Sequence, residues 1–272
     1  MRIDLHIHTT ASDGLYSPTE IVTMAKTSGM DILGIADHDT VGGLAECTEA
    51  AHSHGLRIVP ALEINSYNGS AEYHILGYFI DVKNSRLLST LAELQKSRVR
   101  RMYVMISRLK SLGIPLDAEE ILEIAGDGVV GRPHIARLMI RNGHVKSFRE
   151  AFDKYIGEGR PAYVPRSKLT PKGAIRIIKE AEGLAVLAHP GTWGCDQVIP
   201  HLVSWGIVGI EVYYPEHTPG QVKKYRDLAR AFGLVTTGGS DFHGSDNSNG
   251  ITIGTSCMPM EEFERLERLA GK

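Results

Sequence analysis

The chain has 272 residues, of which 42% are hydrophobic and 23% are charged, values typical of a folded protein with one large α/β domain or a smaller one carrying an insertion. The formal net charge of -2 excludes a global basic field for nucleic-acid binding, although a local basic cleft is compatible with it. The three cysteines are far apart and form no CxxC pair, which argues against a disulfide framework or a cysteine zinc site.

The first residues contain charge and histidine where a signal peptide needs an apolar run. No apolar stretch approaches the length needed to cross a bilayer. We therefore expect a cytoplasmic protein without a membrane segment, and the sequence indicates no obligate protein partner.

Up to about residue 84, short apolar runs alternate with helical patterns. Strands are predicted at 3–7, 31–36, 57–64 and 71–80, and helices at 18–28 and 41–54. Ser17 and Pro18 fit the N-cap and first position of the first helix, and Gly29 fits its end. Such repeated units indicate parallel strands joined by helical crossovers, while the strand at 71–80 can pair locally with residues 62–68.

The pattern becomes helical between residues 85 and 160, with one long helix predicted at 86–112 and shorter ones at 117–125, 133–142 and 147–155. The α/β alternation then returns, with helices predicted at 171–182 and 218–232 and strands at 184–188, 207–213 and 234–238. We therefore expect a discontinuous α/β domain of residues 1–84 and 161–272. A helical insertion of residues 85–160 would cap its active site.

Histidines and carboxylates gather at the predicted strand ends. His6 and His8 lie two residues apart, so both rings point to the same side of a strand. Such a pair alone is as typical of surface or core histidines as of a metal site. Comparable side chains, however, recur near the predicted strands and their ends: Asp13, His38, Glu63, His74, His189, Asp241 and His243. Because α/β folds place their ligands at this rim, we expect two or three ions bridged by a carboxylate.

These motifs, among them His6-x-His8, Asp-His38-Asp and Ser-Asp241-Phe-His243, together resemble the polymerase-and-histidinol-phosphatase (PHP) superfamily. The branch with 3′,5′-nucleotide bisphosphate phosphatases and a 5′→3′ exoribonuclease is the most similar. The resemblance implies a distorted (β/α)7 TIM-like barrel and three ion sites. The first would use His6, His8, Glu63 and Asp241, the second Glu63, His74 and His189, and the third Asp13, His38 and His243. Manganese is the expected ion, and iron and zinc also suit such mixed ligands.

A cluster of ions suits attack of a bridging hydroxide on phosphorus, because bound metal lowers the pKa of water and neutralises developing charge. Arg132 and His134 open a predicted helix, where they fit an anion site and resemble the substrate-binding insertion of the family. Arg166 and Lys168 lie where the chain re-enters the α/β domain and fit either the same cleft or a solvated linker.

Other residues have plainer interpretations. Asp39 fits a helix N-cap or a support for His38, and Glu211 fits either the site or a structural role. The basic residues on the long predicted helix are expected to form a solvated face, namely Lys96, Arg98, Arg100, Arg101, Arg108 and Lys110. A base pocket is the weaker prediction for three tyrosines, Tyr163, Tyr213 and Tyr214.

The leading hypothesis is a metal-dependent phosphatase that removes a phosphate from a small phosphorylated substrate, a nucleotide 3′,5′-bisphosphate. A 5′→3′ exoribonuclease acting on short 5′-phosphorylated RNA is the close alternative. A hydrolase of carbon–nitrogen bonds would leave the cations of the insertion without a purpose. A non-catalytic accessory domain would be favoured by degraded ligand positions, which the sequence does not show.

Overall fold

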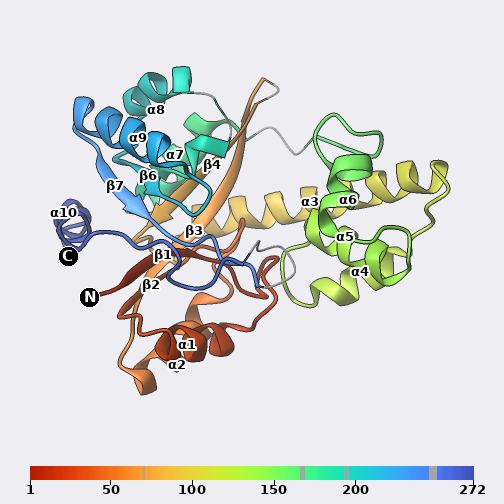
Figure 1. Cartoon of the computed structure of the whole chain (residues 1–272), viewed down its shortest axis with the longest axis horizontal. Coiled ribbons are helices and arrows are strands. Elements are labelled where there is room, and N and C mark those ends of the chain that lie inside the picture. The colour runs from red at the N-terminus through yellow and green to blue at the C-terminus, as the bar shows by residue number, and fades with distance from the viewer. Residues whose placement is uncertain (70, 166–168, 193, 195, 245–249) are drawn as a thin grey trace.

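The computed structural model describes residues 1–272 except 70, 166–168, 193, 195 and 245–249 (Figure 1). Within this part, the strands form one seven-stranded sheet in chain order. They are β1 (Ile3–Ile7), β2 (Ile32–Ile35), β3 (Arg57–Asn68), β4 (Ala71–Tyr78), β5 (Leu184–Leu187), β6 (Gly209–Tyr213) and β7 (Val235–Gly238). Strands β1 to β3 and β5 to β7 pair in parallel, whereas β4 is antiparallel to both neighbours.

The two edges of the sheet approach each other and nearly close a barrel. The backbone N–H of Asp241 donates to the carbonyl of His6 at 2.8 Å, and that of His8 donates to Phe242 at 3.0 Å. An isolated parallel bridge joins Ile7 and Phe242. The predicted α/β barrel is therefore confirmed, with β4 as its antiparallel element.

Helices surround the barrel, which explains why most strand residues are buried on both faces. They are α1 (Pro18–Thr27), α2 (Leu44–His54), α7 (Pro171–Glu180), α8 (Ile199–Trp205), α9 (Pro219–Ala231) and α10 (Met260–Leu269). Ser17 caps α1 and Pro18 opens it, as predicted, and Ser17 also forms a capping box with Glu20. No helix in the described part of the chain combines the length and hydropathy needed to cross a membrane.

A group of helices follows β4 and lies beside the barrel (Figure 1). It consists of α3 (Ser85–Ser111), α4 (Ala118–Ala125), α5 (Arg132–Arg141), α6 (Phe148–Ala151) and a π-helical turn (Phe152–Ile156). These helices share an apolar cluster of their own, which includes Met105, Ile121 and Ile135. The long helix predicted at 86–112 is thus confirmed as α3, which runs from the barrel into the helical group.

Candidate metal centre

The rings of His6 and His8 lie inside one end of the barrel with their centroids 5.1 Å apart, and both residues are fully buried. The barrel closes tightly at this point, since a Cβ added to Gly239 would lie 2.4 Å from the Cβ of His6. Only glycine at position 239 therefore lets the chain after β7 approach β1 and bring Asp241 to the two rings.

Glu63 is at the centre of the cluster. Its Oε1 lies 2.7 Å from Nδ1 of His74 and 3.1 Å from Nε2 of His189. Its Oε2 lies 2.7 Å from Nδ1 of His38 and 3.5 Å from Nε2 of both His6 and His8. Burial opposes ionisation of this carboxylate, but the imidazoles, first His38 and His74, hold its pKa well below the usual range. One carboxylate thus faces five histidines from four segments of the chain.

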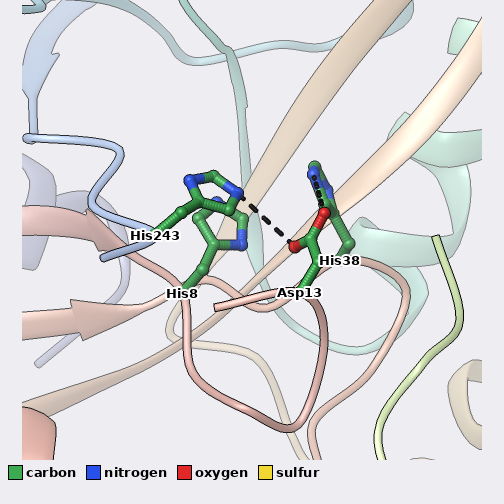
Figure 2. A group of neighbouring side chains, drawn as sticks. All are labelled: His8, Asp13, His38 and His243. Carbon is green, nitrogen blue, oxygen red and sulfur yellow. Dashed lines mark ion pairs between the residues drawn. The ribbon is translucent and has the colours of Figure 1, made fainter. Parts of the chain in front are cut away.

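A second part of the same cluster, drawn in Figure 2, consists of His8, Asp13, His38 and His243. Asp13 projects from the loop after β1 with its Oδ1 3.4 Å from Nε2 of His243 and its Oδ2 4.0 Å from Nε2 of His38. The rings of His8 and His243 stack with centroids 3.9 Å apart. All nine side chains singled out in the sequence therefore meet at one end of the barrel.

Four sets of these side chains have one nitrogen or oxygen each within 4.8 Å of the others. The sets are His8, Asp13, His38 and His243; His6, His189 and Asp241; His6, His8 and Glu63; and Glu63, His74 and His189. The side chains of Asp241 and His243 are 17% and 16% exposed, so the cluster opens to solvent on their side.

Several buried atoms of the cluster have no hydrogen-bond partner among the described residues. They are Nε2 of His6, both ring nitrogens of His8, Nδ1 of His38, and one oxygen each of Asp13, Glu63 and Asp241. Leaving buried polar atoms unpaired is costly, so such a group calls for a ligand. Imidazole nitrogens and carboxylate oxygens in this arrangement fit divalent metal ions.

Three residues of the rim have left-handed backbones, with φ values of 52° at Asp39, 23° at His189 and 52° at Asp241. A backbone hydrogen bond holds each of them. The N–H of Asp39 donates to the carbonyl of Glu63, and the N–H of Asp241 donates to the carbonyl of His6. The N–H of His189 donates to Oε2 of Glu211. Non-glycine residues in this region are strained and gather at functional sites.

The carboxylates beside His38 support the rim. Asp37 accepts hydrogen bonds from the backbone and hydroxyl of Thr9 and from the hydroxyl of Ser12, so it holds the loop that carries Asp13. Asp39 does not cap α2, whose N-cap is Gly43, and the N-cap interpretation is therefore wrong. Instead, Asp39 forms an ion pair of 2.6 Å with Arg98.

The prediction of a solvated basic face on α3 is wrong for Arg98 and Arg101, which are buried. Arg98 donates to Asp39 and, through Nη2, to Oδ1 of Asn65 at 2.7 Å, while Arg101 donates to the carbonyl of Val164. The other basic residues of this run are exposed as predicted: Lys96, Arg100, Arg108 and Lys110. The helical periodicity places Arg98 and Arg101 on the inner face, next to Leu94 and Met102.

Two further carboxylates touch the rings. Glu211, for which the sequence left two roles open, lies with Oε1 3.0 Å from Nδ1 of His6. Glu72 was not predicted, and its Oε1 lies 3.2 Å from Nε2 of His74. Its position two residues before His74, on the same face of β4, was the available signal. Tyr214 donates from its hydroxyl to Oδ2 of Asp241 at 3.2 Å.

The predicted anion-binding residues open α5 at the edge of the cluster. Nδ1 of His134 accepts the N–H of Gly131 at 2.9 Å, and burial lowers the pKa of His134 to about 4. The guanidinium of Arg132 lies over the rings of Phe152 and Tyr163 and 3.8 Å from Oε2 of Glu72. Arg166 and Lys168, predicted for the same role, lie outside the described residues.

The chain matches known proteins along most of its length. The model of the PHP domain matches residues 4–158. A 5′-3′ exoribonuclease of Haemophilus influenzae is 33% identical over 89% of this chain and 90% of the relative. A 3′,5′-nucleoside bisphosphate phosphatase of Chromobacterium violaceum is 32% identical over 95% and 94%. A solved structure from Bifidobacterium adolescentis, described as a metal-dependent phosphoesterase, has a TM-score of 0.91 at 28% identity and covers 98% of this chain and 96% of its own.

Proposed function

Because the chain belongs to the PHP-domain family and is a metal-dependent phosphoester hydrolase, we propose that its substrate is a nucleotide 3′,5′-bisphosphate. The relative that carries this activity aligns with nearly the whole chain, including the helical group from α3 to α6. That group, which we take as an insertion of residues 85–160, brings Arg132 to the edge of the cluster and so supplies a cation for a second phosphate.

We assign the metal ions to the nine clustered side chains. His6, His8, Glu63 and Asp241 would hold one ion, Glu63, His74 and His189 a second, and Asp13, His38 and His243 a third. Three of the four sets of neighbouring atoms support this grouping, with His8 also within reach of the third ion. The remaining set places His189 beside His6 and Asp241, so His189 also lies within reach of the first ion. Manganese is the proposed ion, and the imidazoles and carboxylates of the cluster are also compatible with iron and zinc. When bound, such ions lower the pKa of water and polarise phosphoryl oxygens.

The side chains around the ions have separate tasks. Glu63 touches both halves of the cluster and would fix the spacing of the ions, because its two oxygens face different histidines. Arg132 and the N-terminus of α5 would bind the phosphate that is not cleaved. The hydroxyl of Tyr214 beside Asp241 would orient that carboxylate. Water reaches the cluster from the side of Asp241 and His243, where the side chains are partly exposed.

The observation that carries the assignment of the metal ions is the central position of Glu63 among the histidines. Glu63→Gln removes the negative charge that faces five imidazoles but keeps the shape, so turnover should fall by at least about 100-fold, a loss of roughly 2.7 kcal/mol or more of transition-state stabilisation. Manganese-loaded protein is assayed on nucleotide 3′,5′-bisphosphates. Glu93→Gln, an exposed glutamate of α3, is the matched control and should retain full activity. Near-normal turnover in Glu63→Gln would contradict the assignment.

A 5′→3′ exoribonuclease is the second candidate, favoured by the relative from Haemophilus influenzae. The same assay separates the two when it includes dinucleotides and 5′-phosphorylated RNA oligomers. Faster turnover of oligomers than of mononucleotide bisphosphates would replace the first proposal by the second. Absence of turnover with every phosphoester, while metal is bound, would contradict both.

A further inference from the structure

Glu211 is a fully buried carboxylate near the end of β6. Among the described residues, each of its oxygens has one hydrogen-bond partner. Oε1 lies 3.0 Å from Nδ1 of His6, and Oε2 accepts the backbone N–H of His189 at 2.9 Å. These partners come from β1 and from the loop after β5, so one side chain connects two separate parts of the cluster. Neither contact is to an atom that faces the proposed ions.

The contact with His6 determines where that ring carries its hydrogen. An ionised carboxylate only accepts hydrogen bonds, so the facing Nδ1 must be the donor. In a neutral imidazole the other nitrogen then has a free lone pair. That nitrogen, Nε2, lies 3.3 Å from Oδ1 of Asp241 and 3.5 Å from Oε2 of Glu63, and it is buried without a hydrogen bond among the described residues. A lone pair at this atom is what metal binding requires.

The contact with His189 holds its backbone. This residue has a φ of 23°, a conformation that L side chains rarely adopt, and its N–H points at Glu211. The same conformation directs its ring at the cluster, with Nε2 3.1 Å from Oε1 of Glu63. Loss of the acceptor would leave a buried N–H unpaired and release the strained backbone.

We propose that Glu211 is a positioning residue of the metal centre, which sets the tautomer of His6 and holds the backbone of His189. This inference rests on the proposed function, in which both histidines bind ions. Carboxylates that orient metal-binding histidines in this way typically contribute 10- to 100-fold to metal affinity.

Glu211→Gln tests the tautomer without changing the shape. The N–H of His189 still needs an acceptor, so the amide oxygen faces it and the amide NH2 faces Nδ1 of His6. The reverse orientation would place two donors against each other. Nδ1 must then accept, and the ring hydrogen moves to Nε2, where it blocks the metal. If Glu211 only filled space or only held the backbone of His189, its replacement by glutamine would leave the tautomer of His6 unchanged.

Two measurements check the inference. Manganese affinity of Glu211→Gln should fall about 10- to 100-fold relative to wild type. Burial opposes protonation of the His6 ring, but the neighbouring carboxylates Glu211, Asp241 and Glu63 raise its pKa. The metal-free protein with 15N-labelled histidine is therefore titrated upward until the ring is neutral. The NMR signal of the neutral His6 ring should then change from the Nδ1–H tautomer in wild type to the Nε2–H tautomer in Glu211→Gln. Wild-type affinity together with an unchanged tautomer would overturn the proposal, as would lower affinity with an unchanged tautomer.

Two controls separate the causes. Leu266→Ala in α10 removes a buried side chain from the apolar cluster of that helix and should lower stability while manganese affinity stays the same. His6→Gln removes the proposed ligand itself. If His6→Gln weakens manganese binding and Glu211→Gln does not, the role of Glu211 is refuted and the centre stands. If His6→Gln also binds manganese normally, the proposed centre has failed.

Discussion

Replacing Arg98 with methionine tests how the helical group is attached to the rim of the proposed metal centre. The ion pair of Arg98 with Asp39 has side chains that are only 6% and 4% exposed, and its atoms lie 2.6 Å apart. Removing one member of such a pair leaves an uncompensated buried charge, which typically costs about 3–5 kcal/mol. Asn65 also loses a donor, which adds about 1 kcal/mol. The expected loss, about 4 kcal/mol or more, is a large part of the 5–15 kcal/mol that stabilises most domains.

The assay is urea unfolding of the chelated protein, with the slope of the transition checked for constancy between variants. Asp39→Asn in the Arg98→Met background should recover much of the loss, because no buried charge is then left unpaired. Asparagine suits position 39, whose φ is 52°. Lys96→Met is the matched control on the same helix, where the exposed pair with Glu93 contributes at most about 1 kcal/mol. A cost for Arg98→Met as small as that of the control would refute the reasoning.

Two further predictions concern Arg132 and His134, which lie at the edge of the cluster. Arg132→Ala should raise KM for a nucleotide bisphosphate about 10- to 100-fold, since a charge-assisted hydrogen bond contributes about 1.5–3 kcal/mol. The manganese content of the variant should stay at the wild-type level. An unchanged KM would exclude Arg132 from substrate binding. Burial lowers the pKa of His134 from 6.5 to about 4. As pH falls, the histidine of the unfolded chain is therefore protonated before that of the folded protein. The free energy of unfolding should then fall by about 3 kcal/mol at most between pH 6.5 and pH 4. His134→Gln should flatten this part of the pH profile of unfolding, and a profile that matches wild type would count against it.

The nine clustered residues could be predicted because most follow a parallel strand at its carboxyl end. His38, His189 and Asp241 are such cases, and each follows its strand within three residues. His74 meets them for another reason. Its strand, β4, is antiparallel, so its first half lies at the rim where the others end. The prediction of local pairing between residues 62–68 and 71–80 was therefore needed to place His74 correctly.

The sequence could not predict which charges are buried. Arg98 and Lys96 stand two residues apart on α3, yet only Arg98 reaches a carboxylate inside, because that depends on where the helix meets the barrel.

Two helices of the structure, α8 and α10, were not predicted from the sequence. Helix α8 spans seven residues and contains a proline, and α10 has two fully buried apolar residues, Phe263 and Leu266, among many charges. Packing against the barrel stabilises α8, which is too short for a clear helical period. In α10 the buried apolar residues recur three apart, so the helical pattern was present in the sequence.

The helical group and the cluster are joined at the residues that position the proposed ligands. Arg98 binds Asp39, next to His38; Arg132 lies beside Glu72, which contacts His74; and Arg137 donates to the carbonyl of Asp13 at 2.7 Å. In addition, the N–H of Val129 donates to the carbonyl of Ala11 in the same loop as Asp13. Any motion that lifts the helical group away must break the buried pair of Arg98 and Asp39, at a cost of several kcal/mol. The proposed substrate-binding cation, Arg132, is therefore placed relative to the proposed metal ligands by the fold itself, so a change in either part alters the geometry of both.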